Sequence, residues 1–279
     1  AGLRLTAAAG ETRLAGAEGA ATPFLGYDGR LPGPVLRARR GETLVIDLAN
    51  GLGEPTGLHG LGLRRGPAGG PAFAIAPGTS TRIALTSRDA GTFLYRPGLG
   101  EGDAQLRQGL AGLLLVDDAA PPVHDRQLAL LVSEAAIPAA EGARTIILAD
   151  GRPELALDAR PNERLWLRLA NGTAQRILQL TVPDQPLTLV ALDSQPCEPF
   201  RLDGGRLVLA PGQRAEVMWD VTGAAGTEIP VALTNFAGAT LAGRLAIAGE
   251  PVRASPLADP SALPANPVAQ AMDFRRAAR

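Results

Sequence analysis

Apolar residues occupy every second position in two stretches of the chain. Residues 43–48 place leucine or isoleucine at positions 44, 46 and 48, and residues 164–169 place leucine at positions 165, 167 and 169. A period of two is typical of β-strands with one face in a core and the other in solvent. Both stretches are therefore predicted to be half-buried strands.

Further short apolar runs, closed by turns such as Asp28-Gly29 and Asp203-Gly204-Gly205, indicate more strands. The predicted strands are 81–86, 92–96, 112–117, 127–133, 144–148, 206–209, 214–221, 229–234 and 241–248. Many short apolar runs separated by turns predict an all-β protein.

A block of residues occurs twice along the chain. Each residue of the second copy lies 121 residues after its counterpart in the first. The first copy contains Leu36, Arg39, Glu42, Leu44 and Asn50, and the second contains Leu157, Arg160, Glu163, Leu165 and Asn171. Residues 76–78 and 90–92 recur at a slightly larger spacing as 210–212 and 225–227. A tandem duplication explains this spacing, so we expect two copies of one Greek-key β-sandwich.

Length and composition agree with two all-β domains. The 279 residues are enough for two domains with a core each. The chain is 46% hydrophobic and 20% charged, which argues against disorder, and its 34 glycines and 24 prolines suit a protein with many turns.

The charge balance indicates which classes of partner the chain would attract. The net charge is −1, so there is no overall basic field to attract nucleic acid, and nucleic acid is not expected as a partner. All 27 basic residues are arginine, which genome composition explains most simply, although arginine also recognises carboxylates with two hydrogen bonds. No apolar run approaches the ~20 residues that cross a bilayer, so no membrane span is predicted.

Two short segments look like altered copper-binding motifs. Residues 56–64 read TGLHGLGLR, and residues 91–98 read GTFLYRPG. They resemble motifs of the multicopper oxidases, which read His-Trp-His-Gly and Gly-Thr-aromatic-Trp-Tyr-His-Pro-His. His59 matches the first histidine, whereas Leu61, Arg96 and Gly98 stand at the other three. The similarity continues through residues 24–29, 31–34, 40–43, 108–113, 192–199 and 209–217.

The resemblance implies two tandem cupredoxin-like Greek-key β-sandwich domains, over residues 1–118 and 119–250. Residues 251–279 are then a linker-like C-terminal tail. Its residues 251–267 are rich in proline, alanine and serine, and residues 272–276 could form a short helix or anchor. In three-domain members of the family such a segment leads into a third cupredoxin domain.

The resemblance also implies which copper ligands an intact oxidase needs. The family holds a type 1 copper with cysteine and two histidines, and a trinuclear cluster with eight histidines shared by the first and last domains. This chain has two histidines in total. Leu61 and Gly98 supply no side-chain donor, and the Arg96 guanidinium has no lone pair to give. We therefore expect no copper cofactor; His59 alone is weighed as a vestigial metal ligand against a hydrogen-bonded or rim histidine.

The remaining candidates carry weaker signals. His124 is expected to be a solvated residue of the interdomain connection, and Cys197, with no histidine nearby in sequence, is expected to be a small buried hydrophobe. Arg96, Glu101 and Asp103 could form a new catalytic site near the missing ligands, but charged loop residues usually face water. No catalytic or cofactor-binding residue is predicted, and enzymatic activity stays an open question.

Two functions remain in consideration. The first is a copper-free pseudo-oxidase acting as a binding or scaffold protein for an unknown protein partner, similar in kind to the copper-lacking, division-associated members found in some bacteria. The second is the N-terminal part of a copper oxidoreductase whose third domain is missing, with copper held in that domain. The family resemblance implies a periplasmic location, and docking or self-association through the first domain is expected if it exposes an apolar face.

Overall fold

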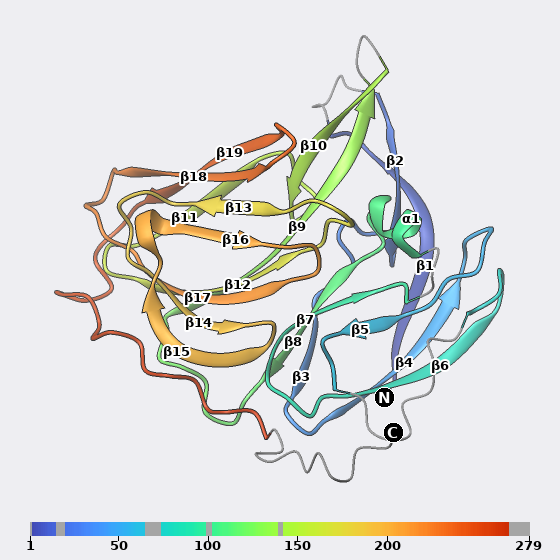
Figure 1. Ribbon diagram of the computed structural model, residues 1–279, viewed down its shortest axis with the longest axis horizontal. Coiled ribbons are helices and arrows are strands. Elements are labelled where there is room, and N and C mark those ends of the chain that lie inside the picture. Colours follow the sequence, from blue (N-terminus) through green and yellow to red (C-terminus); the bar gives the residue numbers. More distant parts are fainter. Residues whose placement is uncertain (1, 15–19, 65–73, 99–101, 139–141, 268–279) are drawn as a thin grey trace, which may run out of the picture.

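A computed structural model describes residues 2–14, 20–64, 74–98, 102–138 and 142–267. Glu101 and the helix or anchor expected at residues 272–276 lie outside the described residues. Two β-sandwiches lie side by side, as Figure 1 shows, which confirms the prediction of an all-β protein with tandem cupredoxin-like domains. The domain boundaries after residues 118 and 250 stay predictions.

The first sandwich consists of two four-stranded sheets, ordered β2-β1-β4-β6 and β3-β8-β7-β5. Its elements are β1 (Leu3–Thr12), β2 (Thr22–Tyr27), β3 (Leu36–Arg39), β4 (Thr43–Asn50), β5 (His59–Leu61), β6 (Ser80–Thr86), β7 (Gly91–Arg96), the α-helix α1 (Gly102–Arg107) and β8 (Gly112–Asp117).

The second sandwich pairs a six-stranded sheet, ordered β10-β9-β12-β17-β14-β15, with a five-stranded sheet, ordered β11-β19-β18-β13-β16. Its elements are β9 (Arg126–Pro138), β10 (Ala143–Ala149), β11 (Leu155–Ala159), β12 (Arg164–Asn171), β13 (Leu178–Thr181), β14 (Leu187–Leu192), β15 (Gln195–Arg201), the 3₁₀ turn η1 (Asp203–Gly205), β16 (Arg206–Leu209), β17 (Arg214–Asp220), β18 (Glu228–Asn235) and β19 (Thr240–Ile247). Within the described part of the chain, no helix is long and apolar enough to cross a membrane.

The repeated asparagines perform the same task in both sandwiches. The side-chain amide of Asn50 donates to the carbonyl of Ile75 at 2.8 Å, and that of Asn171 donates to the carbonyl of Leu209 at 2.9 Å. Each asparagine Oδ1 also accepts the backbone N–H two residues further on. Each buried side chain thus satisfies backbone groups that the strands leave unpaired. This shared role gives the sequence repeat a physical reason.

Strand β12 departs from the sequence prediction. Strand β4 is half-buried as expected, but all eight residues of β12 are buried, including Arg164, Trp166 and Arg168. The expectation of a half-buried strand at residues 164–169 was therefore wrong. The reason is tertiary: the side chains of β12 that would point to water in an isolated sandwich are covered by the first sandwich and by the chain after β19.

An apolar cluster joins the two sandwiches. Leu94, Leu113 and Leu115 on β7 and β8 pack with Leu131 and Ala170 on β9 and β12. All five side chains are nearly inaccessible to solvent. We call this set the interdomain cluster; because it removes apolar area from water on both partners, it favours one relative orientation of the sandwiches.

Residues 251–267, which we call the strap, contain no helix or strand but are fixed along the protein. Asn162 Nδ2 donates to the carbonyl of Arg253 at 2.8 Å, and Arg164 Nη2 donates to that of Ala258 at 2.6 Å. Figure 1 shows the strap in red, passing from the second sandwich toward the first. The linker-like composition thus describes a segment held by hydrogen bonds along its length.

The end of the strap connects both sandwiches through one side chain. Leu263 packs against the cluster around Trp166. Asn266, 7% exposed, accepts the N–H of Ala90 at 2.8 Å and donates to the carbonyls of Ser194 at 2.7 Å and of Ala90 at 3.1 Å. Since Ala90 belongs to the first sandwich and Ser194 to the second, the amide stabilises the interface.

We predict that Asn266→Ala lowers the free energy of unfolding by about 2 kcal/mol or more, because it leaves buried backbone donors and acceptors without partners. Gln175, an exposed amide residue, is the matched control, and Gln175→Ala should change stability little. Urea denaturation of the three proteins measures the difference. Equal effects of the two substitutions would contradict the bridging role of Asn266.

Candidate functional site

The segments that resemble copper motifs meet as neighbouring strands of the first sandwich. β5 pairs antiparallel with β7, so His59 lies opposite Arg96 and Leu61 lies opposite Leu94. His59 and Arg96 are both half-buried. The structure therefore brings together three of the four positions at which intact motifs would carry histidine.

Leu61 has a packing role where a ligand would be expected. Its side chain contacts the interdomain cluster. It also reaches the turn before β17, since a Cβ atom added at Gly212 would lie 2.8 Å from Leu61 Cδ2. The side chain at this ligand position thus fills the contact between the two sandwiches, and it has no atom that could bind a metal.

The donor set around His59 does not fit a trinuclear copper cluster. Arg96 places a permanent positive charge across the strand pair from His59, and Gly98 has no side chain. Copper sites need imidazole, thiolate or comparable donors. Among the described residues, no group of three or more His, Cys, Asp or Glu side chains is arranged to hold a metal ion.

Two other candidate residues lie away from this site. His124 was expected to be solvated, but it is half-buried: its ring packs edge-on against Trp166 with centroids 5.1 Å apart, and Nδ1 donates to the carbonyl of Pro122 at 2.7 Å. Cys197 is half-buried on β15 against the core of the second sandwich, and burial raises the pKa of its thiol. Asp103 lies in α1, and its catalytic grouping with Arg96 stays a hypothesis.

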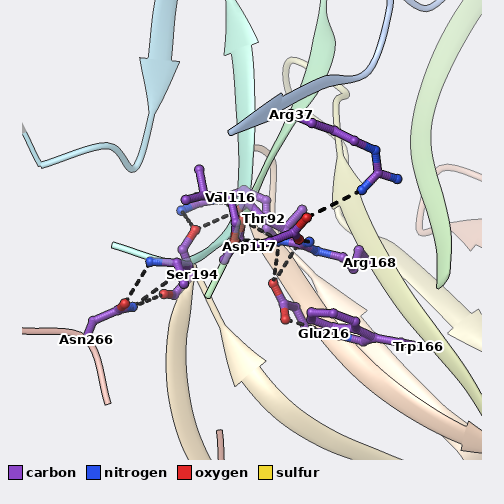
Figure 2. Close-up of polar contacts among 12 residues, drawn as sticks. Arg37, Thr92, Val116, Asp117, Trp166, Arg168, Ser194, Glu216 and Asn266 are labelled. Atoms are coloured by element: carbon purple, nitrogen blue, oxygen red, sulfur yellow. Dashed lines mark hydrogen bonds and ion pairs between the residues drawn. The ribbon is translucent and has the colours of Figure 1, made fainter. Parts of the chain in front are cut away.

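A buried polar network lies beside the altered motif, at the start of β7. Arg168 is completely buried and directs its guanidinium from β12 into the first sandwich (Figure 2). Nε donates to Thr92 Oγ1 at 2.9 Å, Nη1 donates to Asp117 Oδ1 at 2.7 Å, and Nη2 donates to the carbonyl of Gly91. One side chain of the second sandwich thus makes charge-assisted hydrogen bonds to both β7 and β8.

Glu216 on β17 completes this network from the second sandwich. Its Oε1 accepts the hydroxyl of Thr92 at 2.7 Å and lies 3.4 Å from Arg168 Nη2, while Oε2 accepts Trp166 Nε1 at 3.1 Å. The Arg168 guanidinium also lies over the Trp166 ring, 4.7 Å from its centroid. Every charged group here has partners, which a buried ion pair requires.

Sequence reasoning missed this network. Arg164, Trp166 and Arg168 alternate with leucines, as the solvent-facing residues of a half-buried strand would. The available signal was a tryptophan between two arginines, and these arginines lie opposite Asp220 and Glu216 on β17. Only the positions of the first sandwich and the strap show that these residues are buried.

Comparison with known proteins assigns the family. One multicopper oxidase family model matches residues 9–121, and a second matches residues 123–227. The chain belongs to the multicopper oxidase family. These matches confirm the resemblance inferred from the altered motifs.

Relatives of known name support the same assignment. A multicopper oxidase of Staphylococcus epidermidis is 29% identical over 234 residues, which cover 74% of this chain and 50% of that protein. Cell division protein FtsP of Edwardsiella tarda is 31% identical over 239 residues, covering 76% and 49%. The chain thus spans about half the length of the curated relatives it matches.

A solved structure supports the same family assignment. The crystal structure of a multicopper oxidase from Pseudomonas thermotolerans superimposes with a TM-score of 0.83 and 30% identity, covering 97% of this chain and 68% of that one.

We predict that Arg168→Ala destabilises the protein by about 3 to 5 kcal/mol, because removing one partner leaves the buried carboxylate of Glu216 uncompensated. The control is Arg82→Ala, which removes an exposed arginine paired with Asp47; it should leave stability almost unchanged. Thermal and urea unfolding of both variants provide the measurement. A small effect of Arg168→Ala would mean that the network contributes little to the interface.

Proposed function

We propose that this protein is a copper-free member of the multicopper oxidase family that acts as a periplasmic binding or scaffold protein for a protein partner. The observation that supports the proposal is which residues occupy the positions where intact motifs carry copper ligands. Leu61 packs between the sandwiches, Arg96 lies opposite His59, and Gly98 offers no donor. The fold is retained while the donor set of its family chemistry is missing.

A relative named for cell division supports a non-oxidase role. FtsP of Edwardsiella tarda matches over 76% of this chain and is named a cell division protein. A fold hosts many functions, so the role has to follow from the site and its chemistry. We propose a role in which the surface of this protein holds a partner, with cell division as one setting for it.

Copper content after loading tests the proposal. The protein is incubated with excess copper, desalted and assayed by elemental analysis, with the visible spectrum recorded on the same sample. We expect less than roughly a tenth of a copper ion per chain and no visible absorption, since the donors are missing.

His59→Ala is the matched control for this measurement. If residual copper is bound at His59, the variant should lose it, and if binding is non-specific, the two proteins should retain equal traces. One or more tightly held copper ions per chain, lost on His59→Ala, would contradict the proposal.

The second candidate function is an oxidoreductase in which these residues are the N-terminal part of a larger copper protein. The length of this chain relative to an oxidase agrees with this function, because the multicopper oxidase of Staphylococcus epidermidis is matched over only 50% of its length. Copper would then be held by a further domain, beyond these 279 residues. Because FtsP is also matched over only 49% of its length, chain length alone does not separate the two functions. The mass and the copper content of the protein as made in its own cells separate them: a longer chain that carries copper favours the oxidoreductase, and a chain without copper, whatever its mass, favours the scaffold.

A further inference from the structure

Three arginines from separate segments converge on one open groove of the first sandwich. Arg40 follows β3, Arg64 follows β5, and Arg88 lies between β6 and β7. Together with Gly41 and the strap residues Ala265 and Pro267, they line a hollow of about 730 Å³. We propose that this groove binds an oxyanion, a phosphate or carboxylate group, held between the guanidinium of Arg88 and those of Arg40 and Arg64.

Two of the arginines are fixed in place before any ligand arrives. Arg64 forms a two-pronged ion pair with Asp89, whose side chain is 1% exposed. Arg40 Nη2 lies 3.0 Å from Asp118 Oδ1, and that side chain is 10% exposed. In both pairs the carboxylate is more buried than its arginine, since the side chains of Arg64 and Arg40 are 37% and 32% exposed, so the guanidinium is the partner that a ligand can reach. Pre-ordered guanidiniums lose less entropy when they bind an anion.

Arg88 supplies the charge that is not neutralised. It is exposed, and within the part of the chain that the structure describes it forms no ion pair. The turn that carries it is hydrogen-bonded to the turn of Arg40: Gly41 N donates to the carbonyl of Ser87 at 2.6 Å, and Ser87 N donates to that of Glu42 at 2.9 Å. The two arginines are thus held on adjoining turns.

The backbone leaves room for a ligand at this point. Gly41 has a φ of +88°, and no atom of the described residues lies within 4 Å of a Cβ atom added there. The strap forms the opposite wall, where the carbonyls of Ala265 and Pro267 already accept hydrogen bonds from Arg40 and Arg64. An anion would therefore face guanidinium groups and not unpaired carbonyl oxygens. Planar guanidiniums match the oxygens of phosphate and carboxylate well.

This arrangement couples anion binding to the strap. Because Ala265 and Pro267 form one wall, the groove is complete only while the strap is docked. Any ligand that binds the complete groove stabilises the docked strap by mass action. The residues that line the groove include none of the copper-motif positions, so phosphate binding can be tested separately from the proposed function.

Titration with inorganic phosphate in a low-salt buffer, followed by the arginine Nε–Hε resonances in NMR spectra, tests the proposal. We expect saturable shifts of a small set of these resonances, one of which disappears in Arg88→Ala, with phosphate affinity weakened about tenfold in that variant. Glutarate is the second probe and reports whether the site accepts carboxylates; binding of either probe with this dependence on Arg88 supports the proposal.

The matched control is Arg206→Ala, which removes an exposed arginine of β16 on the other sandwich. Its phosphate affinity should equal that of the unmodified protein. Asn266→Ala keeps every arginine but weakens strap docking, so it should also reduce phosphate affinity. Failure of both probes to bind, or equal weakening by Arg88→Ala and Arg206→Ala, would overturn the proposal.

Discussion

The structure depends on one constraint: β12 and β17, the central strands of the six-stranded sheet of the second sandwich, are buried on both faces. One face forms the core of its own sandwich, and the other contacts the first sandwich and the strap. Arg168 is the centre of this second contact, since its guanidinium has hydrogen-bond partners on β7 and β8 and an ion-pair partner on β17. A buried charge needs all of its partners, so the network tolerates only one arrangement of the two sandwiches.

The altered copper motif and this interface share the same strand. β7 begins in the polar network at Thr92, contributes Leu94 to the interdomain cluster and ends at Arg96, opposite His59. Leu61 extends the apolar contact from β5 toward Gly212. The motif positions are therefore continuous with the packing that joins the sandwiches, and Leu61 contributes to that packing at a position where intact motifs carry histidine.

The sequence predicted the architecture well because its signals are local or repeated. The alternation in residues 43–48 and the duplicated Asn50 and Asn171 reflect strand faces and backbone contacts within each sandwich. Strand β1 was not predicted, because its alanine-rich sequence has little β propensity of its own and gains order by pairing with β2 and β4. The burial of β12 could not be predicted, since it depends on which surface the first sandwich covers. The strap was missed for the same reason: proline-rich composition indicates the lack of regular structure, not the presence of docking partners.

The shared interface makes the two sandwiches and the strap one cooperative unit, and calorimetry of the intact chain tests this most directly. If the doubly buried strands β12 and β17 couple the sandwiches, heating should give a single transition in which the calorimetric and van't Hoff enthalpies agree. Two separate transitions, or a calorimetric enthalpy well above the van't Hoff value, would show that the sandwiches unfold independently and would contradict this claim.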